Sequence, residues 1–388
     1  MTVEFYLKNC RTVTLNDISS TLSDDVIDEY IDIYKEIPID ISRIATLEKT
    51  NCILHNGSVN VLLFDLYLLK ELANLNSILF YPNSKKEKFG VIYSLKTLAE
   101  NLLFRREYRI AEKFLKLHNQ FFRDIITASH KDLIVDEVVS MTYLQGRFIT
   151  AHEYGHLIFD KQDSKKVELT KANLKNFIKT TFRESDLTEA FEIKARKAHI
   201  KIFNQSHYNK DFSILPDSKF KVPVEKLKII KNNLTEDDSL LEEMICDEIA
   251  LDLLFRKYPP NEYISNSTAS IVFLYHLRYF SIGSRYSYGF IDESDVDDLF
   301  FSIDIRTRAL TDFAYGKIEN KLGRNEANNW LKNIETIKNK HLDLITFQMM
   351  FPAWTALKKE FKYSKEHPKS TSLKDELSLR HSIIKMLS

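Results

Sequence analysis

The chain has 388 residues, of which 44% are hydrophobic, enough to bury the core of one large domain or two ordinary ones. This composition excludes an intrinsically disordered protein. Basic and acidic residues balance at 55 each, which excludes an overall field that would draw the protein to nucleic acid or an acidic membrane.

The N-terminal part of the chain has a mixed pattern. Val3–Leu7 and Val13–Leu15 are strand-like, whereas apolar residues recur at helical spacing in Asp24–Ile37. Cys52–Phe64 holds two β-prone runs around an Asn-Gly dipeptide, which readily supplies the positive φ angles of a tight turn. We therefore predict a small N-terminal sheet that includes a hairpin at Cys52–Phe64.

Most of the remaining chain is predicted to be helical. Only eight glycines and eight prolines are present, which favours helices over a turn-rich β-sandwich. Apolar residues recur every three or four positions along several segments. These are Leu66–Leu75, Gly90–His118, Asp136–Phe159, Ser239–Phe255, Ala269–Phe280, Asp295–Phe313 and Asn325–Phe361, with Pro352 expected to break or kink the last of them.

Positive charge is concentrated between two of these helices. From Ser164 to Leu234 there are 16 lysines and arginines against 8 aspartates and glutamates. This excess is either an electrostatic surface for an acidic protein or nucleic acid, or a set of solvated helix faces, and the sequence leaves both interpretations open. We predict that the segment is an insertion or surface subdomain.

These patterns indicate a predominantly helical α+β fold, best described as one domain with an insertion. Residues 1–85 form the mixed α/β part and residues 86–163 a helical part. Residues 164–238 form the basic insertion, and residues 239–388 form a C-terminal helical part.

His152, Glu153 and His156 form an HExxH motif inside the helix predicted at Asp136–Phe159. Residues four apart project from the same helix face, so the two histidines can bind one metal ion. Zinc suits two imidazoles and an oxygen ligand and leaves a position for water, from which Glu153 would take a proton. Gly155 is unfavourable in a helix and indicates a close approach by another segment. The alternative is a pair of ordinary histidines satisfied by hydrogen bonds.

The helix predicted at Ser239–Phe255 carries Glu243 and Asp247 on one face. A glutamate oxygen can complete a two-His, one-Glu zinc site, and a carboxylate one turn later can accept the distal N–H of a liganding histidine. We therefore predict Glu243 as the third ligand and Asp247 as the support of a histidine. Glu242 is the competing ligand, but its helix face continues through Cys246 and apolar residues, which indicates packing. The alternative is an acidic, exposed helix N-terminal half, which the macrodipole favours.

The chain resembles the gluzincin metallopeptidases in these two segments. HEYGH at His152–His156 is followed by ExxCD at Glu243–Asp247, which is similar to the ExxAD or ExxSD of thermolysin-like relatives. The step of 87 positions from His156 to Glu243 is longer than in compact members. The resemblance implies a zincin-like domain, a zinc cofactor and peptide hydrolysis.

A third element lies near the C-terminus. His367-Pro368 and the later Arg380 are similar, at a stretched spacing, to the HPxxxxR element of several intracellular zinc peptidases. A histidine or arginine near the metal would stabilise an oxyanion, so His367 and Arg380 are candidate catalytic residues. A surface turn and an ordinary helical arginine are the alternative. Tyr154, Tyr275 and His276 could donate to the same oxyanion, but we assign them no role.

Cysteine usage and the N-terminal residues bear on location. Three scattered cysteines argue against a disulfide framework, and the first 17 residues lack the features of a secretory signal. The most apolar stretch, Val59–Tyr81, is interrupted by three charged residues, so no membrane span is predicted. We expect a cytoplasmic protein.

The functional expectation is an intracellular zinc metallopeptidase that acts on a protein or peptide. Its location and helical body resemble selective proteases of the Lit phage-exclusion type or the ImmA type that cleaves repressors, which implies a role in defence, toxicity or regulation. The alternative is a catalytically inactive, zinc-stabilised regulatory protein that holds a protein or nucleic acid through Lys165–Lys231.

Overall fold

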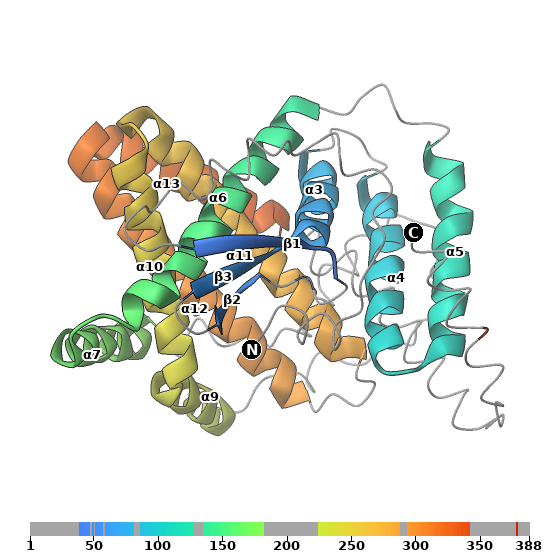
Figure 1. Ribbon diagram of the computed structural model, residues 1–388, viewed down its shortest axis with the longest axis horizontal. Coiled ribbons are helices and arrows are strands. Elements are labelled where there is room, and N and C mark those ends of the chain that lie inside the picture. The colour runs from blue at the N-terminus through green and yellow to red at the C-terminus, as the bar shows by residue number, and fades with distance from the viewer. Residues whose placement is uncertain are drawn as a thin grey trace.

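The computed structural model describes most of the chain from Ile39 to His341. The described residues are 39–46, 49, 51–56, 59–80, 86–126, 135–181, 224–287, 293–341 and 378. Over these residues the fold is mostly helical with one three-stranded sheet, which confirms the predicted α+β class (Figure 1). The segments predicted at Val3–Leu7, Val13–Leu15 and Asp24–Ile37 lie outside the described residues, as does Pro352.

The sheet consists of β1 (Ile39–Ile44), β2 (Cys52–Asn56) and β3 (Val59–Asp65) in the order β1-β3-β2. β2 and β3 are antiparallel, with Asn56 opposite Val59, so the predicted hairpin is confirmed. β1 pairs with β3 in parallel and was not predicted. Its sequence IDISRI alternates apolar with polar residues over only its first four positions, too short a run to distinguish an edge strand from a loop.

Helices make up most of the remaining described chain. Six of the seven predicted segments are helical in all of their described residues, and the exception is Gly90–His118. The helices are α3 Leu66–Phe80, α4 Lys86–Phe104, α5 Tyr108–Ile126, α6 Val135–Phe159, α7 Ser164–Thr181, α9 Val224–Glu236, α10 Asp238–Lys257, α11 Tyr263–Ser287, α12 Glu293–Leu322 and α13 Arg324–His341, with a short 3-10 turn at Pro260–Glu262. None of the helices in this described part is long and apolar enough to cross a membrane.

One predicted helix is wrong in its continuity, because Gly90–His118 is divided between α4 and α5. The N–H groups of Arg105 and Arg106 donate to carbonyl oxygens three residues back, and Arg106 has a φ of 62°. This tight ending turns the chain so that α5 lies beside α4 (Figure 1). No glycine or proline marks the turn, and the apolar spacing continues on both sides of it, so periodicity could not reveal the break.

Buried charges between α3 and α4 are paired. Glu71 is fully buried and accepts hydrogen bonds from the Tyr93 hydroxyl and from Lys96 Nζ at 2.8 Å. Glu100 is also fully buried and lies 2.5 Å from Lys49 Nζ. Although burial alone would raise the pKa of Glu71, Lys96 and Lys49 lower it to about 2. These pairs let a charged stretch form part of the core.

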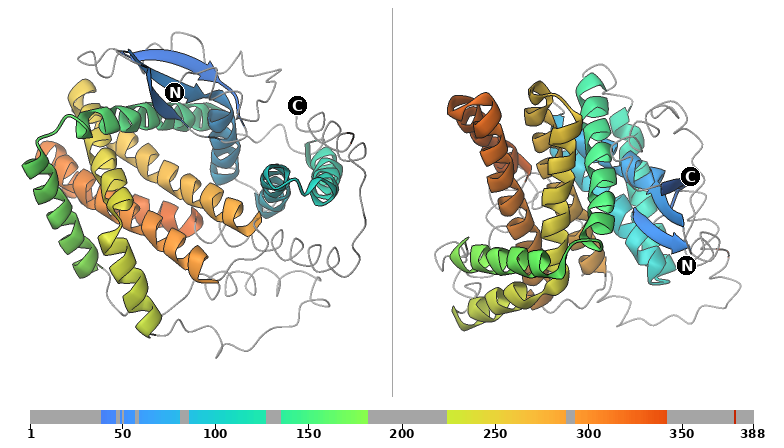
Figure 2. Two further views of the ribbon diagram at one scale, coloured as in Figure 1. Left: turned by 60° about the horizontal axis from the view of Figure 1, so that its bottom comes forward. Right: turned by 60° about the vertical axis from the view of Figure 1, so that its left-hand side comes forward.

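Helix α6 occupies the middle of the molecule. Figure 2 shows it between the sheet on one side and α10, α11 and α12 on the other. Leu62 and Phe64 of β3 belong to the same buried apolar cluster as Phe148 and Ala151 of α6 and Leu251 of α10. Burial on both sides therefore fixes the orientation of α6, and with it the direction in which its histidines project.

The described parts of residues 164–238, the segment predicted as a basic insertion, include α7 and α9, which lie side by side at one end of the molecule (Figures 1 and 2). Lys171 Nζ lies 3.2 Å from Asp238, and Lys175 Nζ lies 2.8 Å from Glu236. Part of the positive excess is therefore neutralised within the chain. Lys165, Lys166 and Lys179 on α7 are exposed to solvent.

Candidate metal centre

Helices α6 and α10 approach each other closely at Gly155. A Cβ atom built on Gly155 would lie 2.9 Å from the carbonyl oxygen of Cys246 and 3.1 Å from its Cα. The obstructing atoms are backbone and cannot rotate aside. The glycine is thus required by the close approach of a second segment, as its position in the sequence predicted.

Replacing Gly155 by alanine is expected to lower the free energy of unfolding of the metal-free protein by about 1–3 kcal/mol, because the methyl group would push two helices apart. Gly316 is the matched control, since it lies inside α12 and a Cβ built there meets nothing within 4 Å. Gly316→Ala should raise stability by about 0.5–1 kcal/mol through helix propensity. Urea unfolding of both variants measures the difference, and equal stability of Gly155→Ala and wild type would contradict the packing argument.

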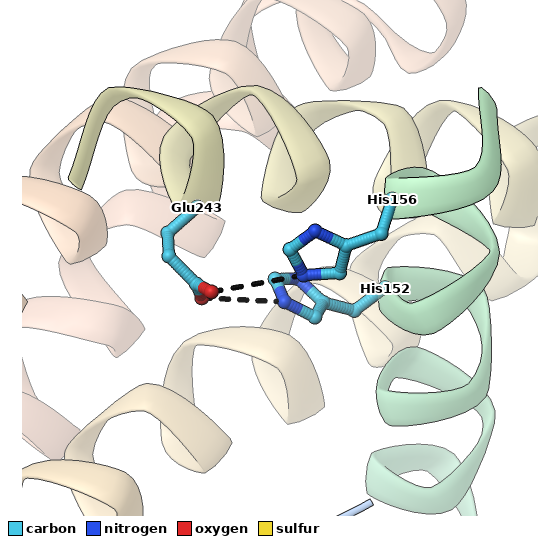
Figure 3. Close-up of side chains that lie close together, drawn as sticks. All are labelled: His152, His156 and Glu243. Atoms are coloured by element: carbon cyan, nitrogen blue, oxygen red, sulfur yellow. Dashed lines mark ion pairs between the residues drawn. The ribbon is translucent and has the colours of Figure 1, made fainter. Parts of the chain in front are cut away.

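His152, His156 and Glu243 meet where the two helices touch (Figure 3). Nε2 of His152 lies 3.3 Å from Oε2 of Glu243, and Nε2 of His156 lies 3.6 Å from Oε1. One ligand atom from each residue lies within 4.8 Å of the others. Two nitrogens and a carboxylate in this arrangement are donors that suit zinc. The structure thus brings together the three residues that the sequence predicted as ligands.

Each histidine has a carboxylate at its other ring nitrogen. Nδ1 of His152 lies 2.9 Å from Oδ1 of Asp247, although the N–H direction is not aligned with that oxygen, and Nδ1 of His156 lies 3.0 Å from Oε1 of Glu242. A carboxylate in this position orients the ring and leaves Nε2 for a metal. Asp247 therefore lies where it was predicted.

Glu242 makes a contact that the sequence did not predict. Its helix face was interpreted as a packing face, and Cys246 and Leu253 on that face are buried, but the carboxylate of Glu242 contacts His156 and its side chain is 39% exposed. The ring of His156 lies between the neighbouring carboxylates of Glu242 and Glu243, with one nitrogen facing each. Apolar periodicity cannot show such a contact, because it is made between two helices.

The electrostatics of the site follow from burial and charge pairing. Burial would lower the pKa of His152, but the nearby carboxylates of Asp247 and Glu243 outweigh it and raise the pKa to about 10. Burial would raise the pKa of Glu243 and Asp247, but His152 and Arg306 hold both below their usual values. The carboxylates of Glu243 and Asp247 therefore stay ionised beside two cationic groups, and a metal ion that binds His152 must displace a proton.

Glu153 lies next to His152 on α6 and is partly buried. Burial raises its pKa to about 7, Glu243 adds to the rise, and His152 opposes it. A carboxyl group with a pKa near neutrality is suited to proton transfer. Burial also raises the pKa of the Cys246 thiol, which lies 3.4 Å from Nδ1 of His156, so this sulfur stays protonated.

Arg306 of α12 completes the site and was not identified from the sequence. Its Nε and Nη2 donate to the two oxygens of Asp247 at 2.8 and 2.9 Å, and its Nη1 lies 2.9 Å from Oε2 of Glu243. Nothing in the sequence distinguishes it from the other basic residues of helical segments. Arg306 can be recognised only from its position in the folded protein, because it lies on a third helix.

The other candidates for oxyanion stabilisation are placed differently or lie outside the described part of the chain. Tyr154 and Tyr275 are buried in the core with 1% exposure each. His276 forms a hydrogen bond of 2.9 Å with Oδ1 of Asn76 between α11 and α3. His367 and Arg380 are not among the described residues, so their predicted roles stay predictions.

Comparison with known proteins adds no further information about the site. The sequence matches no protein-family model, and neither a curated protein nor a solved structure shows significant similarity to the chain.

Proposed function

We propose that this protein is a zinc-dependent metallopeptidase in which His152, His156 and Glu243 bind the metal and Glu153 is the general base. The observation that carries the proposal is the convergence of two Nε2 atoms and one carboxylate from segments 87 positions apart. Carboxylates at both distal ring nitrogens support it, because they select the tautomer that a metal requires.

The number of ligands and their exposure favour catalysis over a purely structural role. Structural zinc sites are closed by four protein ligands, whereas catalytic sites have three and keep a position open. Among the described residues this site offers three ligands. The side chain of His152 is 10% exposed, but those of His156 and Glu243 are 27% and 34% exposed. A substrate would reach the site from the side of these two residues.

When bound, zinc would polarise the scissile carbonyl group and make water a competent nucleophile near neutral pH. Glu153 would take a proton from the attacking water and deliver it to the departing amine nitrogen, so that one water is added across the C–N bond. His152 and His156 would be held in orientation by Asp247 and Glu242. We further propose a dedicated protein substrate inside the cell, with a role in defence, toxicity or regulation.

The test combines metal analysis with proteolysis. The full-length protein should bind one zinc ion, and it should cleave some members of a peptide library. Chelation with 1,10-phenanthroline should abolish cleavage, and added zinc should restore it. Failure to bind zinc at micromolar free concentration would remove the proposal. Stoichiometric zinc without cleavage of any peptide would favour the zinc-stabilised regulatory protein.

A further inference from the structure

Arg306 contacts two carboxylates of the candidate metal site, and no role has yet been assigned to it. It lies on α12, whereas the histidines lie on α6 and the acidic residues on α10. The residue is 8% exposed, and all three guanidinium nitrogens are within 2.9 Å of a carboxylate oxygen. A long basic side chain is immobilised in this way only at an entropic cost, which the contacts must offset.

The contacts of Arg306 form a closed ring that includes two of the three predicted metal ligands. Arg306 binds Asp247, Asp247 contacts Nδ1 of His152, and Nε2 of His152 faces Glu243. Glu243 in turn lies 2.9 Å from Arg306. One guanidinium group therefore orients a predicted ligand directly and a second one through Asp247. The planar fork of arginine can bind two carboxylates at fixed angles, which the ammonium group of lysine cannot do.

We propose that Arg306 is a positioning residue of the metal site, which holds Glu243 and Asp247 in the arrangement needed by the metal ligands. This inference rests on the proposed metal site. A role through charge and a role through positioning predict opposite changes in metal affinity when Arg306 is replaced. A cation next to a divalent metal repels it, so charge alone predicts tighter metal binding when Arg306 is neutralised. Positioning predicts weaker binding, even when the positive charge is kept.

The experiment measures metal affinity and cobalt spectra of full-length Arg306→Lys and Arg306→Gln. Zinc affinity is determined by competition with a chromogenic chelator, and the visible bands of the Co²⁺-loaded protein report the geometry of the ligands. Arg308→Lys is the control, because Arg308 lies on the same helix, pairs with Asp304 at 2.8 Å and is 35% exposed. Circular dichroism and urea unfolding without metal show whether each variant folds.

Arg306→Lys is expected to bind zinc about 10–100-fold more weakly and to change the cobalt bands, as is typical when the partner of a metal ligand is lost. Arg308→Lys should match wild type in both measurements. Wild-type affinity and spectrum in Arg306→Lys would overturn the proposal, and so would tighter binding by Arg306→Gln. Failure of Arg306→Lys to fold while Arg308→Lys folds would also overturn it, because it would show a structural role. If wild type itself binds neither metal, the proposed function fails.

Discussion

Replacing Glu153 by glutamine is expected to lower the rate of peptide hydrolysis by about 10²–10⁴-fold, the usual contribution of a general base. Glutamine has nearly the same shape but cannot accept the proton. Glu153 is not one of the three converging ligands, so the zinc content should stay at the wild-type level. The measurement is kcat for a fluorogenic peptide together with zinc per chain by mass spectrometry.

Glu137→Gln is the matched control, because Glu137 lies on the same helix and is exposed. It should leave both rate and zinc content unchanged. A rate for Glu153→Gln close to that of wild type would remove Glu153 as the base. Loss of zinc along with activity would instead assign Glu153 to the maintenance of the site. The inactive, zinc-loaded variant would also serve to trap the substrate, whose identity the sequence does not reveal.

The sequence predicted those parts of the fold that depend on residues close together in the chain. The Asn-Gly dipeptide between two β-prone runs predicted the hairpin of β2 and β3, and apolar spacing predicted the helices that carry the site. α10 begins one residue before the predicted start. Its N-cap Asp237 accepts hydrogen bonds from the N–H groups of Ser239 and Leu240.

Features that depend on contacts between distant segments were missed. The break between α4 and α5 lets two amphipathic helices pack against each other, and β1 is recognisable only through its pairing with β3. In the site, a four-residue spacing on one helix predicted which histidines share a face. Glu242 and Arg306 act across helix interfaces, and a sequence gives no distance between helices.

The role of Gly155 was predicted in part. Its low helix propensity indicated that some segment must pass close to the HExxH helix, and the segment proved to be the backbone of α10 at Cys246. The sequence could predict that a segment passes close to Gly155, but it could not predict which segment. Because Cys246 lies between Glu243 and Asp247 in the chain, the same close approach brings the ligand helix within reach of the histidines.

Alanine in place of Glu243 is expected to weaken zinc binding by more than about 100-fold, whereas alanine in place of Glu242 should weaken it by about 10–100-fold at most. The carboxylate of Glu243 faces the Nε2 atoms of both histidines, but that of Glu242 faces Nδ1 of His156 on the side away from the metal position. Competition with a chelator measures both affinities on one scale. The two residues are adjacent, similarly exposed and identical in chemistry, so each variant is the control of the other. The reverse order of the two losses would transfer the ligand role to Glu242, and it would mean that the ring of His156 binds metal through Nδ1.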